Sequence, residues 1–445
     1  MAVLYTLLIL TILSQIGPRP CSAQCLETTF FCNIGVVNMT SDGGVKIRNT
    51  IDKDVDSILM SISIEKLIVS TSAAGPFLQR IAGLTEGITY LVYREPVFQV
   101  PEGNTLEEIE IYNAPNLRSL AVVGTNRHLT RLSVETCTLD RIPPTIPQFV
   151  VLSRLFIMRC ALTALRMDVF AKSPSLYSVS LAQNQIRQLI PFTSPPKERL
   201  TIAYFDLGEN QLERLDMSIF VHMPELERLD VRGNRIVRLE ATVPVTHESL
   251  KRISLDKNQI SSIDTRNLTL TTMSSFYVVE NALTEIPKLL GPMPNLRSLA
   301  FDRNNIKQVD MSVFRRFANV SDIYLNDNKI ESVRTSSPVT LPALNILLFD
   351  NNLIVSPNLT GCIFPDMYFI SFMNNRLTAI PPLFQRFERA RLSVEWNPIK
   401  CANMATFKSR FVEGRLLLST AEEQSDCLTS SMIDLNGKVK GCCDA

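Results

Sequence analysis

Histidine and tryptophan are scarce in this chain, which has 445 residues but only three histidines and one tryptophan. Histidine is the side chain that ordinarily titrates near neutral pH, and it is the commonest metal ligand, so its scarcity argues against general-base catalysis. The pair His247-Glu248 lacks the second histidine of a metalloprotease helix. No nucleophile elbow and no glycine-rich phosphate loop is present. We therefore predict that the chain is not an enzyme and has no catalytic residue and no cofactor.

Metal ligands in a suitable pattern are missing as well. Asp52, Asp54 and Asp56 imitate the start of a calcium-binding loop, but Ser57 and Ser63 stand where that loop needs glycine and glutamate. The cysteines include no C-x-x-C pair with a nearby histidine, which a zinc site would require. We expect no metal site.

An excess of positive charge is absent too, because 45 Lys and Arg residues balance 44 Asp and Glu residues. Nucleic-acid and membrane-surface binders need a basic excess, so the composition argues against both. After the N-terminal segment, no run reaches the roughly 18 apolar residues of a transmembrane helix. The sequence therefore predicts no membrane span.

The N-terminus has the pattern of a secretory signal peptide. The apolar run 1–16 is too short to span a bilayer and is followed by Pro18 and Pro20. The small residues that end at Ala23 fit a cleavage site, so we predict a signal peptide over residues 1–23 and a secreted, extracellular protein. Sequons that fit this route occur at Asn38, Asn267, Asn319 and Asn358.

An internal repeat dominates the rest of the chain. One compact core rarely grows past about 250–300 residues, so a chain of this length favours several domains or a repeat architecture. The template L-x-x-L-x-L-x-x-N/C-x-L fits twelve times, at spacings of 22 to 26 residues, starting at Leu129, Leu152, Leu176, Ile202, Leu226, Leu250, Met273, Leu296, Val320, Leu344, Met367 and Arg389. The ninth residue is always Asn or Cys: Cys137, Cys160, Asn184, Asn210, Asn234, Asn258, Asn281, Asn304, Asn328, Asn352, Asn375 and Asn397. This pattern is typical of leucine-rich repeats.

The repeat predicts the fold class and the domain boundaries. We expect an α/β-type repeat solenoid, a leucine-rich-repeat horseshoe with a parallel β-sheet on its concave face, a mostly extended or short-helix convex face and disulfide-bonded caps. An N-terminal cap would cover 24–63, the repeats 64–399 and a C-terminal cap 400–445. The repeats are clear from residue 129, and weaker copies begin near Ile64, Ile88 and Leu106.

Physical chemistry predicts what each repeat position does. One short strand per repeat buries alternate residues, and the inward Asn side chain bonds backbone groups of adjacent turns that would otherwise be unpaired. Phe170, Phe220 and Phe314 occupy the same position within their repeats and should stack as an apolar spine. Pro244 and Pro338 at a similar phase favour an extended, helix-poor back.

The cysteines predict two caps and leave some pairings open. Cys25 and Cys32 are expected to tie the N-terminal cap, and two bridges whose pairing is undetermined are expected among Cys401, Cys427, Cys442 and Cys443. Cys137 and Cys160 share one phase of consecutive repeats, so they form either a disulfide or two buried thiols. A buried, inert free thiol is favoured for Cys362 over an intermolecular link.

The concave face is the predicted binding surface. Residues that flank the buried strand positions point outward, and a contiguous apolar group there is typical of an interface. A mixed, Arg-rich group occupies the middle and an apolar group the C-terminal third. The predicted partner-binding residues are Arg154, Phe156, Tyr204, Arg228, Arg232, Arg252, Tyr277, Tyr324, Ile346, Leu348, Phe369 and Met373.

The cysteine layout resembles that of the leucine-rich-repeat immune proteins of mosquitoes. The features that carry the resemblance are the N-terminal Cys pair, about a dozen repeats, Cys401 after Asn397, and the double cysteine Cys442-Cys443. The chain is similar to a secreted member without a coiled coil, although Cys401-Ala402-Asn403 departs from the common Cys-x-Cys. The resemblance implies a role in innate immunity, with a complement-like thioester protein or another repeat protein of this family as partner.

Other classes of extracellular repeat protein remain open at this point. An adhesion or matrix protein without an immune role, a shed receptor ectodomain and a secreted enzyme inhibitor are the alternatives. A plant-type inhibitor would show L-x-G-x-I-P in every repeat, whereas Ile-Pro appears only occasionally, for example at Ile142, Ile286 and Ile380. A matrix proteoglycan core would need four N-terminal cysteines, and only Cys25 and Cys32 are present.

Overall fold

The computed structural model describes residues 85–445 without a gap, together with 74–75, 78–79 and short strands nearer the N-terminus. Those strands are β1 (Leu8–Ile9), β2 (Gln24–Cys25), β3 (Cys32–Asn33), β4 (Val36–Met39), β5 (Val45–Arg48) and β6 (Ile64–Val69). Most of the predicted signal peptide and N-terminal cap, and the acidic run at Asp52, lie outside the described residues. Strands β2 and β3 pair antiparallel with Cys25 opposite Cys32, but their side chains are also outside the described part.

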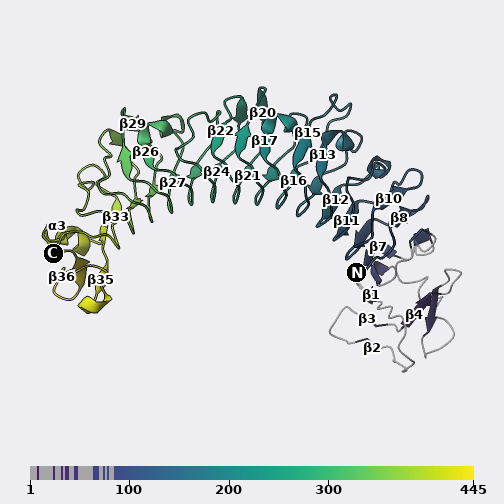
Figure 1. The fold of residues 1–445 in the computed structure, drawn as a ribbon, viewed down its shortest axis with the longest axis horizontal. Coiled ribbons are helices and arrows are strands. Elements are labelled where there is room, and N and C mark those ends of the chain that lie inside the picture. The colour runs from purple at the N-terminus through teal and green to yellow at the C-terminus, as the bar shows by residue number, and fades with distance from the viewer. Residues whose placement is uncertain are drawn as a thin grey trace, which may run out of the picture. The chain divides into compact units, whose positions relative to one another are not determined.

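The chain divides into two compact units. The first unit comprises Met1–Leu212 and His222–Leu226, and the second comprises Glu213–Val221 and Glu227–Ala445. In each unit, successive repeats form coils whose strands add to one parallel sheet, which confirms the predicted solenoid (Figure 1).

The sheet of the first unit begins before the clear repeats. After β6 its strands are β7 (Thr85–Tyr90), β9 (Glu108–Ile111), β11 (Arg131–Glu135), β12 (Arg154–Met158), β14 (Ser178–Ser180) and β16 (Tyr204–Asp206). The pairing register aligns Ile109 with Leu132 and Ile88 with Ile109, so Ile88 occupies the position of the second template leucine. The repeat that we placed at Ile88 therefore starts three residues earlier, at Thr85. The template missed this phase because Tyr93 takes the place of the inward Asn.

The second unit continues the same pattern through the last repeat. Its sheet strands are β18 (Arg228–Asp230), β21 (Arg252–Ser254), β24 (Ser275–Tyr277), β25 (Ser298–Ala300), β27 (Asp322–Tyr324), β30 (Ile346–Leu348), β32 (Phe369–Ser371), β33 (Arg391–Ser393) and β34 (Leu416–Leu417). The final strand, β34, belongs to the C-terminal cap, so the cap extends the sheet beyond the repeats. Arg389 at the first position of the last repeat is exposed, and the neighbouring Ala390 is buried instead.

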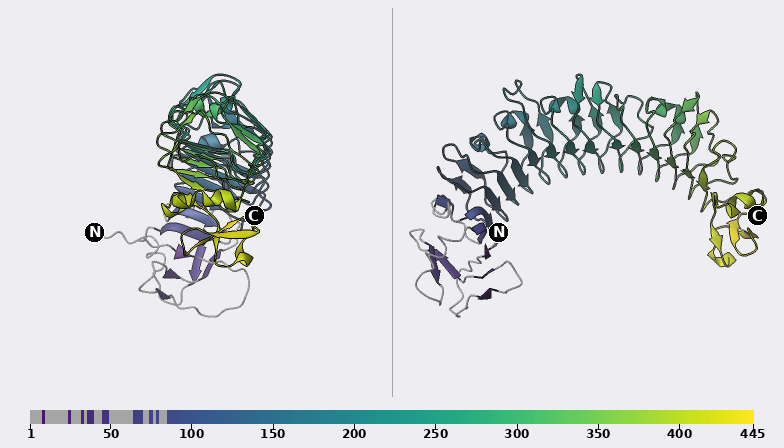
Figure 2. Two further views of the ribbon diagram at one scale, coloured as in Figure 1. Left: turned by 90° about the vertical axis from the view of Figure 1, so that its left-hand side faces the viewer. Right: turned by 180° about the vertical axis from the view of Figure 1, so that it is seen from behind.

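A second layer of short strands and single turns lies on the side of each coil away from this sheet (Figures 1 and 2). In the first unit it contains β8 (Val97–Val100), β10 (Ser119–Val122), η1 (Ile146–Gln148), β13 (Ala164–Arg166), η2 (Met167–Phe170) and β15 (Gln188–Ile190). In the second unit it contains β17 (Arg214–Asp216), η3 (Met217–Phe220), β19 (Arg238–Glu240), β20 (Val245–His247), β22 (Ser262–Asp264), β23 (Leu268–Leu270), β26 (Gln308–Asp310), η4 (Met311–Arg316), β28 (Ser332–Arg334), β29 (Val339–Thr340) and β31 (Cys362–Ile363). Strands β20 and β29 begin directly after Pro244 and Pro338, so the extended, helix-poor back is confirmed.

The inward asparagines join consecutive coils, as Asn352 illustrates. Its Nδ2 donates to the carbonyl oxygens of Phe349 and Asp350 in its own coil and of Leu325 in the preceding coil. Its Oδ1 accepts the N–H of Ile330 at 2.9 Å. Asn184, Asn210, Asn258, Asn281, Asn304, Asn328, Asn375 and Asn397 make the same kind of contacts. Each amide therefore satisfies backbone groups that the close packing of coils shields from water.

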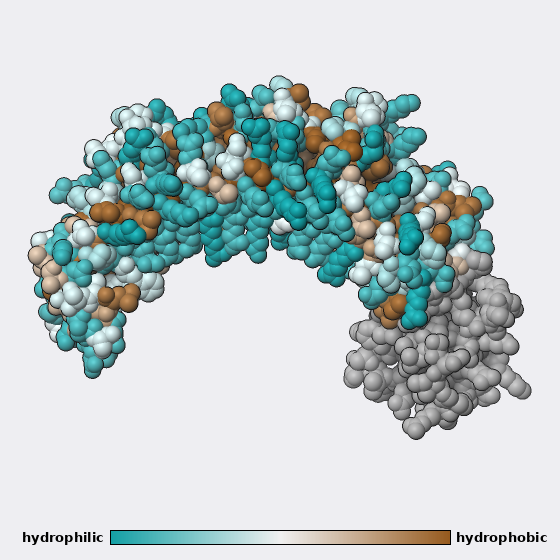
Figure 3. Space-filling view, in the orientation of Figure 1, coloured by the Kyte–Doolittle hydropathy of each residue, from teal (hydrophilic) through white to brown (hydrophobic). Residues whose placement is uncertain are grey.

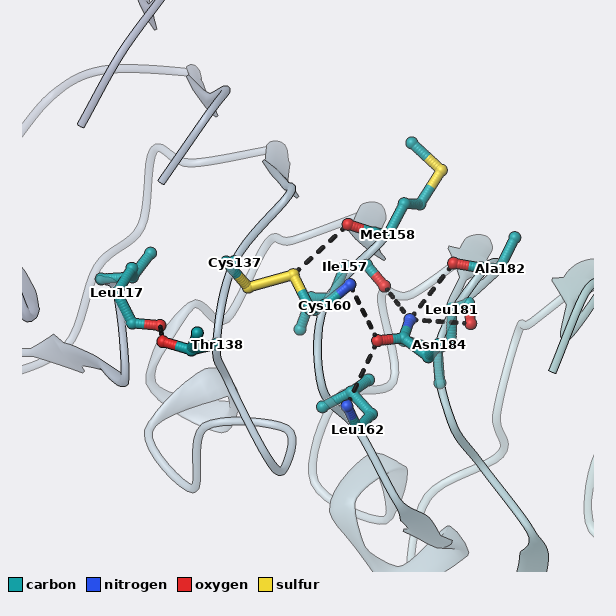
Figure 4. The surroundings of a disulfide bond; sticks show 10 residues. All are labelled: Leu117, Cys137, Thr138, Ile157, Met158, Cys160, Leu162, Leu181, Ala182 and Asn184. Atoms are coloured by element: carbon teal, nitrogen blue, oxygen red, sulfur yellow. Dashed lines mark hydrogen bonds between the residues drawn. A yellow bond between two sulfur atoms is a disulfide. The ribbon is translucent and has the colours of Figure 1, made fainter. Parts of the chain in front are cut away.

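A disulfide replaces two of these amides near the start of the clear repeats (Figure 4). Cys137 and Cys160 are bonded, with their Cα atoms 4.4 Å apart. The Oδ1 atom of Asn184 accepts the N–H of Cys160 at 3.1 Å, so the amide ladder begins on the coil next to the disulfide. Of the two alternatives for this pair, the structure contains the bridge.

The phenylalanines at the back form no single continuous stack. Phe170, Phe220 and Phe314 are buried in η2, η3 and η4, but they belong to repeats that are not consecutive. The parallel ring pair Phe349–Phe372 lies behind the sheet, with centroids 5.3 Å apart. The expected spine at the Phe170 phase is thus replaced by separate buried rings, because neighbouring repeats lack a phenylalanine at that phase.

The C-terminal cap follows the last repeat in the second unit. It contains α3 (Cys401–Ala405), α4 (Lys408–Val412), β34, β35 (Thr420–Ala421), η5 (Gln424–Asp426), β36 (Ser431–Asp434) and β37 (Lys440–Cys443). The last three strands form a small antiparallel sheet in the order β35-β37-β36. Two disulfides, Cys401–Cys443 and Cys427–Cys442, resolve the pairing that the sequence left open.

We predict that Asn352→Ala lowers the free energy of unfolding by about 1–3 kcal/mol, because it leaves several shielded backbone groups unpaired. Urea unfolding followed by circular dichroism measures the change. Asn345→Ala is the control, since the side chain of the half-buried Asn345 makes one hydrogen bond, to the carbonyl of Asp366. Equal losses in the two variants would contradict the role of the inward amide.

We also predict that Cys137→Ala with Cys160→Ala costs about 2–4 kcal/mol, because the disulfide closes a loop in the unfolded chain. Replacing both cysteines with Asn should recover part of this loss, since Asn is the template residue at both positions. Denaturant unfolding of the three proteins provides the comparison. If the double Asn variant is no more stable than the double Ala variant, these two positions do not have the role of the inward amide.

Candidate functional site

The open side of each sheet carries the residues that alternate with the buried strand positions. In β18, for example, Leu229 is buried, whereas Arg228 is exposed and Asp230 is half-buried. Among the predicted partner-binding residues, the exposed ones are Arg154, Arg228, Arg232 and Arg252. The half-buried ones are Phe156, Tyr204, Tyr277, Tyr324, Ile346, Leu348, Phe369 and Met373. The aromatic and aliphatic residues are therefore less accessible than the sequence suggested, because side chains on adjacent strands pack against one another.

In the first unit, side chains of the same chain pack against the predicted aromatic residues. The guanidinium of Arg131 lies 5.4 Å from the ring centre of Phe156 and also pairs with Glu110 at 3.3 Å. The ring of Tyr204 packs edge-on against Tyr177, with centroids 5.1 Å apart. These intramolecular contacts leave little continuous apolar surface on the sheet of the first unit.

The Arg-rich group lies at the start of the sheet of the second unit. Arg228 on β18 is directly opposite Arg252 on β21. Arg232 pairs with Asp230 at 3.1 Å, and Lys251 pairs with Glu227 at 3.0 Å. Because the basic side chains alternate with carboxylates, this end of the sheet has a mixed charge.

A continuous apolar patch covers the later strands of the second unit. We call it the apolar strip and define it as Tyr324, Ile346, Leu348, Phe369 and Met373. On the three adjacent strands β27, β30 and β32, Tyr324 pairs with Leu348, and Ile346 pairs with Phe369. The strip therefore brings together the apolar residues that the sequence predicted for this region. Tyr277 lies farther along the sheet, and its hydroxyl is 3.1 Å from the hydroxyl of Ser298.

A column of carboxylates, whose last two members lie beside the strip, was not recognised as a set from the sequence. We call Asp256, Asp302 and Asp350, at the seventh position of their repeats, the carboxylate column. Asp302 accepts the N–H of Asn326 at 2.9 Å, and Asp350 accepts the N–H of Met373 at 2.8 Å. Burial raises the pKa of all three carboxyl groups despite these hydrogen bonds. The recurrence of Asp at this repeat position was the signal that could have revealed them.

The eighth residue of a repeat, which follows the position of the carboxylate column, has a left-handed backbone in repeat after repeat. Positive φ angles occur at Asn113, Thr136, Arg159, Gln183, Glu209, Gly233, Lys257, Glu280, Arg303, Asp327, Asn351, Asn374 and Trp396. In the second unit some of these side chains bond one another: Arg303 pairs with Glu280, and Asn351 donates to Asp327 at 2.8 Å. Each coil thus turns off the sheet through a conformation that is unfavourable for a non-glycine residue and that its neighbours help to hold.

Acidic residues prevail around the apolar strip. Its acidic neighbours include Asp302, Asp322, Asp327, Asp350 and Glu395. The basic neighbours are Arg391, which lies opposite Phe369 and donates to the carbonyl of Gly414, and Arg303, which pairs with Glu280. Figure 3 shows hydrophilic residues along the inner edge of the second unit. The geometry is therefore that of a shallow apolar surface with an acidic border.

The remaining predicted residues lie away from the strip. Asn267, Asn319 and Asn358 are exposed outside the strands of the sheet, so glycans there would leave the strip accessible. The side chain of Asn38 lies outside the described residues. Cys362 is a buried free cysteine, 3.1 Å from the hydroxyl of Thr335, and burial raises its pKa, which makes the thiol a poor nucleophile.

His247, whose pair with Glu248 was noted in the sequence, is buried in the second layer. Its side chain is 2% exposed, and burial lowers its pKa. Among the residues that the structure describes, no group of three or more His, Cys, Asp or Glu side chains is arranged to hold a metal ion. Within that same part of the chain, no helix has the length and apolar character needed to cross a membrane.

Comparison with known proteins agrees with the fold. A family model described as leucine rich repeat matches residues 294–354. Human leucine-rich repeats and immunoglobulin-like domains protein 3 is 27% identical over 180 residues, which are 40% of this chain and 15% of that protein. Bovine osteomodulin is 27% identical over 218 residues, which are 42% of this chain and 50% of that protein. The chain thus spans half or less of the length of these relatives.

Solved structures show the same architecture. The leucine-rich repeat domain of APL1B has a TM-score of 0.53 at 14% identity, with 71% of this chain and 86% of that chain covered. A leucine-rich-repeat protein of Leptospira interrogans has a TM-score of 0.54 at 17% identity, with coverage of 79% and 89%. At these identities the likeness concerns the fold, and the chain has the leucine-rich-repeat fold.

We predict that Asp302→Asn is more stable than the wild type near neutral pH, because it removes a half-buried charge and keeps an acceptor for Asn326. The pKa of Asp302 is raised in the folded state, so above that pKa the ionised carboxylate lowers the free energy of unfolding. Below the ordinary pKa of aspartate, 3.8, the group is protonated in both states and has no effect on stability. The stability gain should therefore shrink as the pH falls. Thermal unfolding across pH measures it, with the exposed Asp366→Asn as the control for net charge. A gain that is independent of pH would contradict the half-buried charge.

Proposed function

We propose that this leucine-rich-repeat protein is a secreted recognition protein that binds a protein partner on the apolar strip of its second unit. The observation that carries the proposal is the contiguity of Tyr324, Ile346, Leu348 and Phe369 on adjacent strands of an open sheet face. Sheet faces that point to water ordinarily alternate with polar residues, and contiguous apolar patches mark interfaces. Tyr and Phe are also among the residues enriched at interfaces.

The charges around the strip indicate which kind of partner surface would fit it. Acidic residues border the strip, and the carboxylates of Asp322 and Glu395 are complementary to a basic surface. The fitting partner is therefore an apolar ridge or segment flanked by Lys or Arg. A standard interface buries about 1,600 Å² in total, so the contact would extend past the strip onto neighbouring strands such as β24.

We propose innate immunity as the setting of this recognition. Support comes from the double cysteine Cys442-Cys443 after the last repeat, which resembles the cysteine layout of mosquito leucine-rich-repeat immune proteins. Disulfides at Cys137 and in the C-terminal cap fit an oxidising, extracellular compartment. The proposed partner is a complement-like thioester protein or another repeat protein of this kind.

A matrix or adhesion role is the second candidate. It is favoured by the similarity to bovine osteomodulin, which extends over 218 residues at 27% identity. Capture from body fluid before and after microbial challenge, with the whole chain as bait, distinguishes the two roles. Recovery of a thioester protein or of microbial surface material supports the immune role, whereas recovery of matrix proteins supports adhesion.

We predict that Ile346→Asp, Leu348→Asp and Phe369→Asp together weaken binding of the captured partner about 100-fold or more, because hot-spot losses reach about 2 kcal/mol each. The matched control is Val243→Asp, Val355→Asp and Ile363→Asp, which places the same charges on exposed apolar residues outside the large sheet. Calorimetric titration measures both variants, and circular dichroism checks their folding. Unchanged affinity in the folded strip variant would rule out the strip as the binding surface.

A further inference from the structure

The C-terminal cap is held tightly against the last coil of the second unit. Strand β34 pairs with β33, and the N–H of Cys401 donates to the carbonyl of Asp444 at 2.8 Å. The N–H of Asp444 in turn donates to the carbonyl of Ile399 at 2.8 Å. Together with the two cap disulfides, these bonds fix the surface where the coil and the cap meet.

A hollow of about 300 Å³ lies at this junction. We call it the cap hollow, and its lining includes Glu395, Trp396, Pro398, Leu418, Asp426 and Leu428. Glu395 and Trp396 belong to the turn that follows β33, whereas Asp426 and Leu428 flank Cys427 in the cap. The disulfide Cys427–Cys442 therefore holds the cap side of the hollow in place.

Large apolar side chains at this hollow are exposed. Trp396 is 56% exposed and Leu428 is 90% exposed. Trp396 has φ of +57°, and its N–H donates to the hydroxyl of Ser419, so the main chain that carries the exposed indole is fixed. An exposed Trp whose backbone is fixed in a sparsely populated conformation presents apolar area with little further loss of entropy on binding.

The charged side chains that line the hollow are both acidic. Glu395 accepts the hydroxyl of Ser393 at 3.1 Å, and Asp426 accepts the hydroxyl of Ser425 at 3.5 Å. Within the described part of the chain, neither carboxylate forms an ion pair, and no Lys or Arg lines the hollow. The hollow is therefore complementary to a cation and repels an anion.

We propose that the cap hollow binds a Lys or Arg side chain of a protein partner, with an adjacent apolar side chain of that partner on Leu428. Trp is the aromatic residue that attracts cations best through its ring face, and carboxylates form strong charge-assisted bonds with ammonium and guanidinium groups. The indole and the two carboxylates supply both interactions in one place. This docking point shares Glu395 with the acidic border of the apolar strip, but Trp396, Asp426 and Leu428 lie outside the strip.

The test uses the full chain and a random-peptide display library as the probe. Selection on the wild type should enrich peptides that carry Lys or Arg next to an apolar residue. Selection on the double variant Glu395→Gln with Asp426→Asn should lose that enrichment. The matched control, Glu422→Gln with Glu423→Gln, removes the same charge from exposed residues of the cap that do not line the hollow, and it should keep the enrichment.

The single tryptophan provides a direct readout, because Trp396 is the only one in the chain. An enriched peptide should change the Trp emission in a saturable way, and the Glu395→Gln, Asp426→Asn variant should bind about ten-fold more weakly. Replacing the basic residue of the peptide with citrulline or norleucine should have a similar effect. Enrichment without basic residues, or equal affinity for wild type and variant, would overturn the proposal.

Discussion

The structure depends on one repeated interaction, in which the inward amide of a coil bonds the backbone of the coil before it. Asn352, for example, donates to Leu325 and accepts from Ile330 in the preceding coil. Stacked coils shield these backbone groups from water, so the amide determines whether two coils can pack at the spacing of a parallel sheet. At Cys137 and Cys160, a covalent bond takes the same place between two coils.

The same interaction explains why the outward residues form ordered columns. Because the amides hold the strands in register, Ile346 lies beside Phe369, and Tyr324 lies beside Leu348. The register also allows Asp350 to accept a backbone N–H from the next coil, which keeps a carboxylate beside the apolar strip although burial raises its pKa. The proposed interface therefore combines apolar contact with fixed charges, and its shape is set before a partner arrives.

The repeat period predicted the strands and the inward amides because their spacing is a property of the sequence alone. The start of the repeat at Thr85 was misplaced because Tyr93 hides the template there. The left-handed turns could not be predicted, since Glu280 and Trp396 carry no glycine signal. The cap hollow was missed for another reason: Trp396 and Leu428 meet only after the cap folds onto the last coil.

Residue-resolved amide hydrogen exchange of the full chain tests the amide ladder most directly. The N–H groups of Ile306, Ile330, Ile354 and Leu377 each donate to the inward Asn of the following coil. They should therefore exchange as slowly as the amides of the buried strands, because their opening requires adjacent coils to separate. Exchange as fast as that of exposed loop amides would show that the side-chain ladder does not hold the coils together.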